Sequence, residues 1–342
     1  MASSTSNAQT WAQLAESLAA DAPTGGGHGL TTLYPGLHRP ECVLTHASGT
    51  VFVSDRRGGV TKLFPDGRQV LTCASTLLPN GIALMEDGGF LVANLADAGG
   101  VWKITREDEV QPWLTEVEGR RLHRVNFVTN DDTGRVWACV SATDGGDLYP
   151  LDSATGYLVM QGANAAKGAR VVAEGLHYTN ECRVSGDGRF LYVNETFGRK
   201  LSRFALAADG SLSAKETVAT FDAGDFPDGL TLDAEGGAWV VCVGSNRLYR
   251  VDADGRRDTI IDDAVPETVA ALEAAFIART LSRPQLSSAR GRRLGNITSL
   301  AFGGADLRTA YMGCIGGDSL TMFRSPVAGL APAHWHSRWH WR

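Results

Sequence analysis

The chain has 342 residues, a formal net charge of −6 and 43% hydrophobic residues. Its acidic balance, with no basic cluster to offset it locally, argues against binding to nucleic acid or to an anionic membrane surface. A membrane-spanning helix needs about 18 consecutive apolar residues, and no run in the chain approaches that length. The first residues show neither the basic n-region nor the apolar h-region of a signal peptide. We therefore expect a soluble cytoplasmic protein.

The first segment has helical character. Trp11, Leu14 and Leu18 recur at helical spacing between residues 7 and 21, and Asp21 begins a run with Pro and three Gly that ends the pattern. This spacing predicts a short amphipathic helix. We assign residues 1–30 to an N-terminal arm that holds this helix.

From residue 31 onward, a strand–turn–strand unit recurs at intervals of roughly 40 to 50 residues, a period typical of β-propeller blades. Each unit starts with a polar residue at the head of a strand, and its second strand is nearly all apolar. The clearest example begins at Phe226-Pro227-Asp228-Gly229 and leads to Ala238-Trp239-Val240-Val241. We assign residues 31–330 to one all-β propeller domain.

The polar residues that start the units form a second pattern. Equivalent positions of a propeller lie on one ring around its axis, so their side chains would face a common centre. Carboxylate and amide oxygens are the ligands that hard divalent cations prefer. In chain order, the six residues are Glu41, Asn80, Asn126, Asn180, Asp228 and Asn296.

Four of these six are the stronger candidates for a metal site: Glu41, Asn126, Asn180 and Asp228. An Asn or Asp at the head of a strand often caps a turn by bonding to the backbone, whereas Glu is a poor turn residue. For the other two, Asn80 and Asn296, we favour the capping role or a second, structural ion in the channel.

Residues 264–294 interrupt the strand pattern before the last unit. Val269, Leu272, Phe276 and Leu281 recur near the helical period, which predicts one inserted helix. A surface helix packed on a blade edge is the simpler interpretation, and a lid or a dimer contact is the alternative. A homodimer therefore stays open.

The C-terminal tail, residues 331–342, is rich in His and Trp. Metal binding is one interpretation, but we expect such a terminal stretch to pack loosely instead. The residues concerned are His334, Trp335, His336, Trp339, His340 and Trp341.

The six cysteines have neither paired nor metal-type spacing, and three of them stand in predicted strands, where Cys packs as a small apolar residue. We expect buried free thiols. The six are Cys42, Cys73, Cys139, Cys182, Cys242 and Cys314.

Five short segments, taken together, resemble a known family. They are Pro79-Asn80-Gly81, Gly119-Arg-Arg-Leu-His-Arg-Val-Asn126, Thr179-Asn180, Phe226-Pro227-Asp228-Gly229 and Asn296-Ile-Thr-Ser-Leu-Ala-Phe-Gly-Gly304. In this order and spacing, over roughly residues 35–330, they resemble the gluconolactonase / senescence marker protein / luciferin-regenerating enzyme family.

The resemblance implies a six-bladed propeller that hydrolyses lactones or related esters with one divalent ion near the axis. Ca²⁺ is the first expectation, and Zn²⁺, Mn²⁺ and Mg²⁺ also suit such a site. Glu41, Asn180 and Asp228 match the metal ligands, and Asn126 matches an Asn that reaches the ion or holds substrate. Arg124 matches a substrate-binding Arg of some members. Asp228 is also our candidate to take a proton from the attacking water.

The chain departs from the family pattern at two positions. Phe127 follows Asn126 where Asp is usual, and Glu181 follows Asn180 where Gly is usual. Losing that carboxylate removes a partner for a sugar hydroxyl, and Phe127 would add an apolar wall if it points inward. We therefore expect a substrate less sugar-like than an aldonolactone. Glu181 is either an added acid/base or an outward residue of its strand.

Two histidines stand three residues before an Asn of the ring. His123 and His177 are candidates for substrate binding and proton transfer near neutral pH, or simply solvated loop residues.

Three other functions stay open: hydrolysis of another ester or a phosphotriester, a non-hydrolytic ring reaction, and a propeller that only binds a partner.

Overall fold

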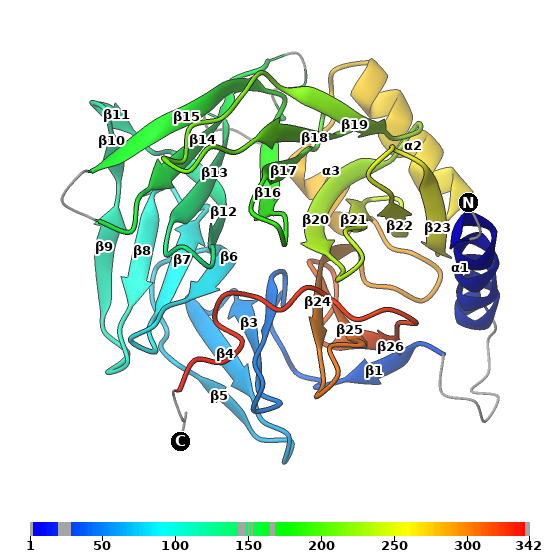
Figure 1. Ribbon diagram of the computed structural model, residues 1–342, viewed down its shortest axis with the longest axis horizontal. Helices are drawn as coiled ribbons and strands as arrows, with labels where there is room; N and C mark the ends of the chain where they lie inside the picture. The colour runs from blue at the N-terminus through cyan, green and yellow to red at the C-terminus, as the bar shows by residue number, and fades with distance from the viewer. Residues whose placement is uncertain are drawn as a thin grey trace.

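The computed structural model describes residues 3–19, 29–142, 148–149, 151, 153–164 and 168–338. Six four-stranded antiparallel sheets stand around one axis, which confirms the predicted all-β six-bladed propeller (Figure 1). Trp339, His340, Trp341 and the predicted end of the first helix at Asp21 lie outside the described residues.

Each blade from the first to the fifth uses four consecutive strands, and the first strand of each packs against the first strand of a neighbouring blade. Blade 1 consists of β2 (Val43–Thr45), β3 (Val51–Asp55), β4 (Gly59–Leu63) and β5 (Gln69–Leu71). Blade 2 consists of β6 (Pro79–Leu84), β7 (Phe90–Asn94), β8 (Val101–Ile104) and β9 (Val110–Leu114). Blade 3 consists of β12 (Arg124–Asn130), β13 (Val136–Ala142), β14 (Gly156–Gln161) and β15 (Ala169–Leu176).

The second half of the ring repeats this arrangement. Blade 4 consists of β16 (Thr179–Val184), β17 (Phe190–Glu195), β18 (Lys200–Ala205) and β19 (Glu216–Thr220). Blade 5 consists of β20 (Phe226–Leu232), β21 (Ala238–Val243), β22 (Arg247–Val251) and β23 (Arg257–Asp262). Blade 6 consists of β24 (Ile297–Gly303), β25 (Thr309–Cys314), β26 (Leu320–Arg324) and β1 (Thr31–Leu33). A separate hairpin joins β10 (Glu116–Val117) to β11 (Arg120–Arg121).

The two ends of the propeller close the ring in blade 6. Strand β1, from the start of the domain, pairs antiparallel with β26 near its end, with Thr31 opposite Met322. Because this pairing joins distant parts of the chain, it fixes the six inner strands at constant positions around the axis.

The inner strands share an irregularity at the positions of the predicted site. In β6, β12, β16, β20 and β24 the pairing register shifts within the first few residues, at β-bulges. The shifts include Pro79/Ile82, Thr179/Cys182 and Pro227/Leu230. A bulge changes the direction of the side chains beside it, so it decides which of two neighbouring residues faces the axis.

Helix α1 (Ser3–Ala19) packs on the outside of blade 5, beside β23 (Figure 1). The apolar residues that predicted this helix, Trp11, Leu14 and Leu18, are all buried. Trp11 meets Trp239 edge to face at 5.6 Å between ring centroids, and the Arg250 guanidinium lies 4.6 Å from the Trp11 ring. The N-terminal helix is therefore docked on the propeller by an aromatic contact and a cation–π contact.

The insertion before blade 6 holds two helices, so the prediction of a single helix is wrong. Helix α2 (Pro266–Ile277) ends before Thr280, and α3 (Arg283–Ser288) begins after Ser282, whose side chain accepts a hydrogen bond from the Gln285 N–H. A Ser N-cap followed by Arg-Pro is a helix-start signal in the sequence. No described helix is long and apolar enough to cross a membrane.

The C-terminal segment packs firmly, so the predicted loose tail is wrong for the residues that the structure describes. It runs across the ring from blade 6 to blade 1 (Figure 1). The Leu330 N–H donates to the Leu232 carbonyl, and the Ala47 N–H donates to the Trp335 carbonyl. His334 and Trp335 are each only 6% exposed. All six cysteines are free thiols, as predicted, and five of them are buried.

The pH dependence of stability tests the packing of this tail. Burial lowers the pKa of His334 to about 4, and its Nε2 donates to the Thr45 carbonyl at 3.0 Å. As pH falls from 6.5 toward 4, His334 binds a proton in the unfolded chain but stays neutral in the folded chain. The free energy of unfolding therefore falls in this pH range. We expect a loss of about 2 kcal/mol at pH 5 relative to pH 8 from this residue.

Urea unfolding of the wild type and of His334→Gln at both pH values measures this loss. Gln retains a donor for Thr45 but does not titrate, so the variant should lose less stability between pH 8 and pH 5. An equal loss in both proteins would contradict the assignment.

Candidate metal and substrate site

The four predicted ligands lie at the heads of the inner strands and are buried. Asn126, Asn180 and Asp228 stand in the bulged starts of β12, β16 and β20, and Glu41 lies just before β2. Their exposed fractions are 3 to 7%. The ring closure of the propeller thus gathers four polar side chains from four blades at one end of the axis.

Three of the four carry oxygens that lack a partner. Glu41 Oε2, Asn180 Oδ1 and Asp228 Oδ1 are buried, and none accepts a hydrogen bond from a described residue. Buried polar atoms almost always find a partner, so three bare oxygens in one place indicate a missing ligand. The Asn180 amide nitrogen is used, since it donates to Thr196 Oγ1 at 3.0 Å.

The acidic side chains of this site act on one another. Burial raises the pKa of Glu41 to about 7 and that of Glu181 to about 8. Burial also raises the pKa of Asp228, and the charges of Glu41 and Glu181 raise it further. Without a cation between them, these carboxyl groups disfavour ionisation, because burial and like charge both oppose the charged form.

Arg39 is part of the site, although our reading of the sequence missed it. Its positive charge lowers the pKa of Glu41 and of Asp228, and its Nη2 donates to Asn80 Oδ1 at 3.0 Å. Arg39 adopts a left-handed backbone conformation, with φ of 52°. The sequence offered one signal for this role, namely a basic residue two positions before Glu41.

Asn80 links Arg39 to Asn126. Its Nδ2 donates to Asn126 Oδ1 at 2.9 Å and to the Asn126 carbonyl at 3.0 Å. The side-chain oxygen of Asn126 therefore already has a donor, unlike the bare oxygens of Glu41, Asn180 and Asp228.

Asn296 has a structural role, but it bonds to distant backbone groups and does not make the local turn cap that we favoured. Its Oδ1 accepts from the Gly244 N–H at 2.7 Å, and its Nδ2 donates to the Leu286 carbonyl at 2.8 Å. Its backbone is left-handed, with φ of 64°, a conformation that Asn tolerates better than most residues. The sixth polar residue of the ring thus ties blade 5 and α3 to blade 6.

Phe127 does not form a wall of the predicted site. Its ring is 1% exposed and packs in the core between blades, where a Cβ on Gly81 would lie 2.5 Å from its Cδ2. The bulge in β12 explains this direction, because it turns Asn126 toward the axis and its neighbour toward blade 2. The expected apolar wall from this residue is therefore not present.

Glu181 also points sideways, but it stays buried. Its Oε2 accepts from the Leu230 N–H of blade 5 at 3.1 Å and lies 3.3 Å from Arg183 Nη2. The Arg183 guanidinium in turn lies 4.4 Å from the centre of the Phe127 ring. Arg183 thus contacts both Phe127 and Glu181, the two residues at which the chain departs from the family pattern.

The remaining predicted residues lie at the periphery. His123 is exposed, and Arg124 is half-buried with its Nη1 3.5 Å from the Leu95 carbonyl. The His177 side chain is 40% exposed, and its Nδ1 lies 3.7 Å from Glu195 Oε2. Glu195 already accepts from the His177 N–H, Ser202 and Lys215.

An aromatic group lies beside Asp228. The pKa of Tyr149 is raised mainly by burial, then by Tyr178, and also by the charge of Asp228. The Phe197 ring of this group lies 5.8 Å from the ring of Phe226, which stands two residues before Asp228. Tyr149 contacts Tyr178 and Phe197, with ring centroids 5.5 and 4.6 Å apart. The Arg283 guanidinium, from α3, lies 4.6 Å from the Tyr149 ring. The helical insertion therefore packs next to the site.

The donors suit a hard divalent cation. Two carboxylates and one amide, each with one oxygen that lacks a partner, offer such an ion the oxygen ligands that Ca²⁺ prefers. Among the residues that the structure describes, no three His, Cys, Asp or Glu side chains are gathered to hold a metal. The fit therefore depends on Asn180 as the third ligand.

Comparison with known proteins identifies the family. The model of the SMP-30/gluconolactonase/LRE-like region matches residues 39–282. The chain belongs to this family. A 6-deoxy-6-sulfogluconolactonase of Pseudomonas putida is 27% identical over 233 residues, which cover 67% of this chain and 66% of that protein.

One further relative and one solved structure are also similar to the chain. A pentonolactonase of Haloferax volcanii is 26% identical over 246 residues, covering 70% of this chain and 67% of that protein. The structure of a luciferin-regenerating enzyme superposes with a TM-score of 0.69 at 18% identity, covering 90% of this chain and 99% of that chain. This family includes lactonases, and the structural likeness supports the propeller fold.

Replacing Asp228 by Asn tests the repulsion in the metal-free site. An acid whose pKa is raised on folding costs stability as pH rises above its unfolded pKa, because the folded chain holds the proton more tightly. In the presence of EDTA we therefore expect Asp228→Asn to be more stable than the wild type by about 1 kcal/mol or more at pH 8. The gain should shrink at pH 5.

Asn296→Ala is the matched control. It leaves the Gly244 N–H and the Leu286 carbonyl without partners, so it should destabilise the chain by about 2 kcal/mol at both pH values. Denaturant titrations with EDTA measure all three proteins. If Asp228→Asn were less stable than the wild type in EDTA at pH 8, the proposed repulsion between Asp228, Glu41 and Glu181 would be refuted.

Proposed function

We propose that this protein is a divalent-metal-dependent lactonase that opens a lactone or a related cyclic ester. The observation that carries the proposal is the set of three bare, buried oxygens on Glu41, Asn180 and Asp228 at one end of the axis. The curated relatives, which are lactonases by name, support the type of reaction. The oxygen-only donor set favours Ca²⁺.

Glu41, Asn180 and Asp228 would hold the ion. When bound, such an ion supplies Lewis-acid polarisation of the lactone carbonyl and lowers the pKa of a bound water. Arg39 supports the site because its charge favours the ionised forms of Glu41 and Asp228. The hydrogen bond from Arg39 to Asn80 also holds Asn80 against Asn126.

Asp228 is the residue to which we assign proton transfer. Water adds to the carbonyl carbon, its proton passes to an Asp228 carboxylate oxygen, and the ring C–O bond breaks. The proton then goes to the leaving alkoxide, and a hydroxy acid is released. We assign Glu181 a positioning role, since its Oε2 already accepts from the Leu230 N–H and lies beside Arg183. We assign no step to His123 or His177.

A substrate less sugar-like than an aldonolactone is part of the proposal. Tyr149, the partly buried member of the aromatic group that it forms with Tyr178 and Phe197, would supply an apolar surface, which we expect one face of the substrate ring to contact. Phe127 does not contribute to this surface, because its ring lies in the core.

A lactone panel tests the proposal. It compares glucono-δ-lactone with an alkyl-substituted δ-lactone of the same ring size, with and without EDTA. We expect turnover that EDTA abolishes and Ca²⁺ restores, with kcat/KM higher for the alkyl lactone. Asp228→Ala and Asn180→Ala should each lower turnover on the order of 1,000-fold, because each removes a metal ligand.

His123→Ala is the control, since His123 is exposed, and it should retain wild-type turnover. Turnover that persists in EDTA, or in Asp228→Ala, would exclude the metal-dependent mechanism. No turnover of any lactone, with tight Ca²⁺ binding retained, would favour a binding propeller.

A further inference from the structure

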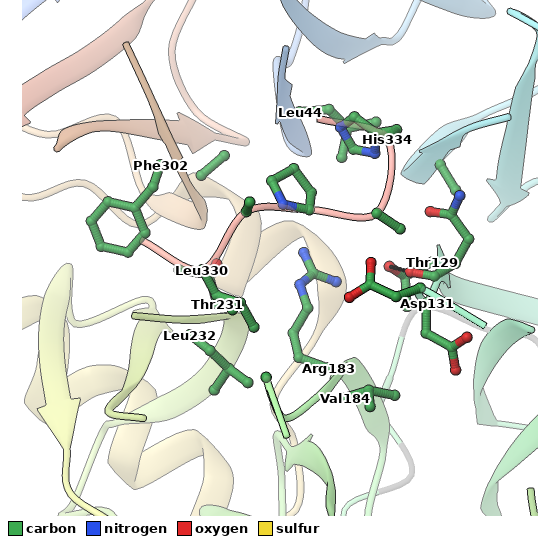
Figure 2. A pocket seen from close by; sticks show the side chains of 18 of the residues that line it. Leu44, Thr129, Asp131, Arg183, Val184, Thr231, Leu232, Phe302, Leu330 and His334 are labelled. Carbon is green, nitrogen blue, oxygen red and sulfur yellow. Dashed lines mark hydrogen bonds between the residues drawn. The ribbon is translucent and has the colours of Figure 1, made fainter. Parts of the chain in front are cut away.

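A cavity lies at the end of the propeller axis away from the proposed metal site. It has a volume of about 320 Å³ and is surrounded by the far ends of the inner strands. Its wall includes Leu44, Thr129, Val184, Thr231, Phe302 and Leu330 (Figure 2). Thr231 follows Asp228 by three strand residues, or about 10 Å. The cavity is therefore separate from the proposed metal site.

The C-terminal segment forms one side of this cavity. Leu330 and His334, which both line it, are tied to the propeller at Leu232 and at Thr45. Figure 2 shows the chain between them passing across the cavity. Because both ends are anchored by hydrogen bonds, the segment completes a defined pocket and does not merely lie over an open channel.

Arg183 supplies a cation to the pocket. Figure 2 shows its side chain reaching from β16 into the middle of the space. Its Nη1 donates to the Cys182 carbonyl at 3.1 Å, and its Nη2 lies 3.3 Å from Glu181 Oε2. A guanidinium carries five N–H donors in a fixed fork. These contacts leave donors to point into the cavity.

The other ionised groups of the wall are committed or exposed. Asp131 accepts from Arg135 Nε at 2.7 Å and from Trp137 Nε1 at 2.8 Å, so Asp131 and Arg135 satisfy each other. Asp187 accepts from Ser185 and Arg189. Asp132 is exposed to solvent, where water screens its charge. Arg183 also has a carboxylate partner, since Glu181 lies 3.3 Å away, and it is the cation that reaches the middle of the space.

We propose that this cavity binds a small organic carboxylate. The carboxylate would lie on the Arg183 guanidinium, which matches its planar, two-oxygen shape. The organic body would pack against Leu44, Phe302 and Leu330. The volume is at the lower end of the range for small-molecule pockets. The wall combines apolar side chains with polar ones, and Arg183 is directed into the space. Such a cavity suits an amphipathic anion better than it suits ordered water alone.

Benzoate is the probe, and benzamide is its neutral analogue of nearly the same shape. Calorimetric titration of the full chain in EDTA should give one benzoate site per chain. Benzamide should bind at least about 10-fold more weakly, because it cannot form the charge-assisted pair. Because this titration is carried out without metal, a failure to bind benzoate would not affect the lactonase proposal. Likewise, a failure of the lactonase test would not affect this proposal.

Two variants test the position of the site. Thr231→Phe fills the cavity and Arg183→Met removes the cation, and each should weaken benzoate binding at least about 10-fold. Thr231→Val, which keeps the volume of the side chain, should bind benzoate as the wild type does.

The Thr231 pair keeps the test valid even if Arg183→Met fails to fold because it leaves Glu181 without its partner. Equal benzoate affinity in Thr231→Phe and Thr231→Val would overturn the proposal. So would equal affinities of the wild type for benzoate and benzamide, or no detectable benzoate binding at millimolar concentration.

Discussion

The structure depends on holding acidic side chains together, away from water, at the axis of a closed ring. Glu41, Glu181 and Asp228 are each at most 7% exposed, and their charges act on one another. Such a cluster opposes folding unless a cation joins it. The pairing of β1 with β26 closes the ring and so holds the cluster in place. The proposed metal site therefore costs stability, which the rest of the propeller supplies.

The bulges of the inner strands decide what this cluster contains. Gly81 and Gly229 follow the polar residue in blades 2 and 5, where a Cβ would collide with the next blade at 2.5 and 2.4 Å. Phe127 and Glu181 occupy the same position in blades 3 and 4. Phe127 packs in the core between blades, and Glu181 accepts a hydrogen bond from Leu230 of blade 5. Arg183 packs on one and pairs with the other. The same arginine borders the cavity at the far end, so the two ends of the axis share a structural element.

The sequence predicted the features that depend on periodicity. The recurring units predicted the propeller, and the polar residue at each strand head predicted Glu41, Asn180 and Asp228 as neighbours in space. It could not predict directions that depend on a bulge, so Phe127 was expected in the site although it lies in the core. Arg39 was missed because its role depends on a left-handed turn and on contact with Asn80 in the next blade. The burial of His334 depends on its bond to Thr45, at the other end of the chain.

The central claim is that Glu41, Asn180 and Asp228 form one cation site. A crystal structure of the protein grown with Ca²⁺ and recorded with anomalous data tests it most directly. We predict a single axial ion with Glu41, Asn180 and Asp228 oxygens at about 2.3–2.6 Å, the range for Ca²⁺. An axis that stays free of metal at millimolar Ca²⁺, or an ion bound without these three residues, would contradict the account.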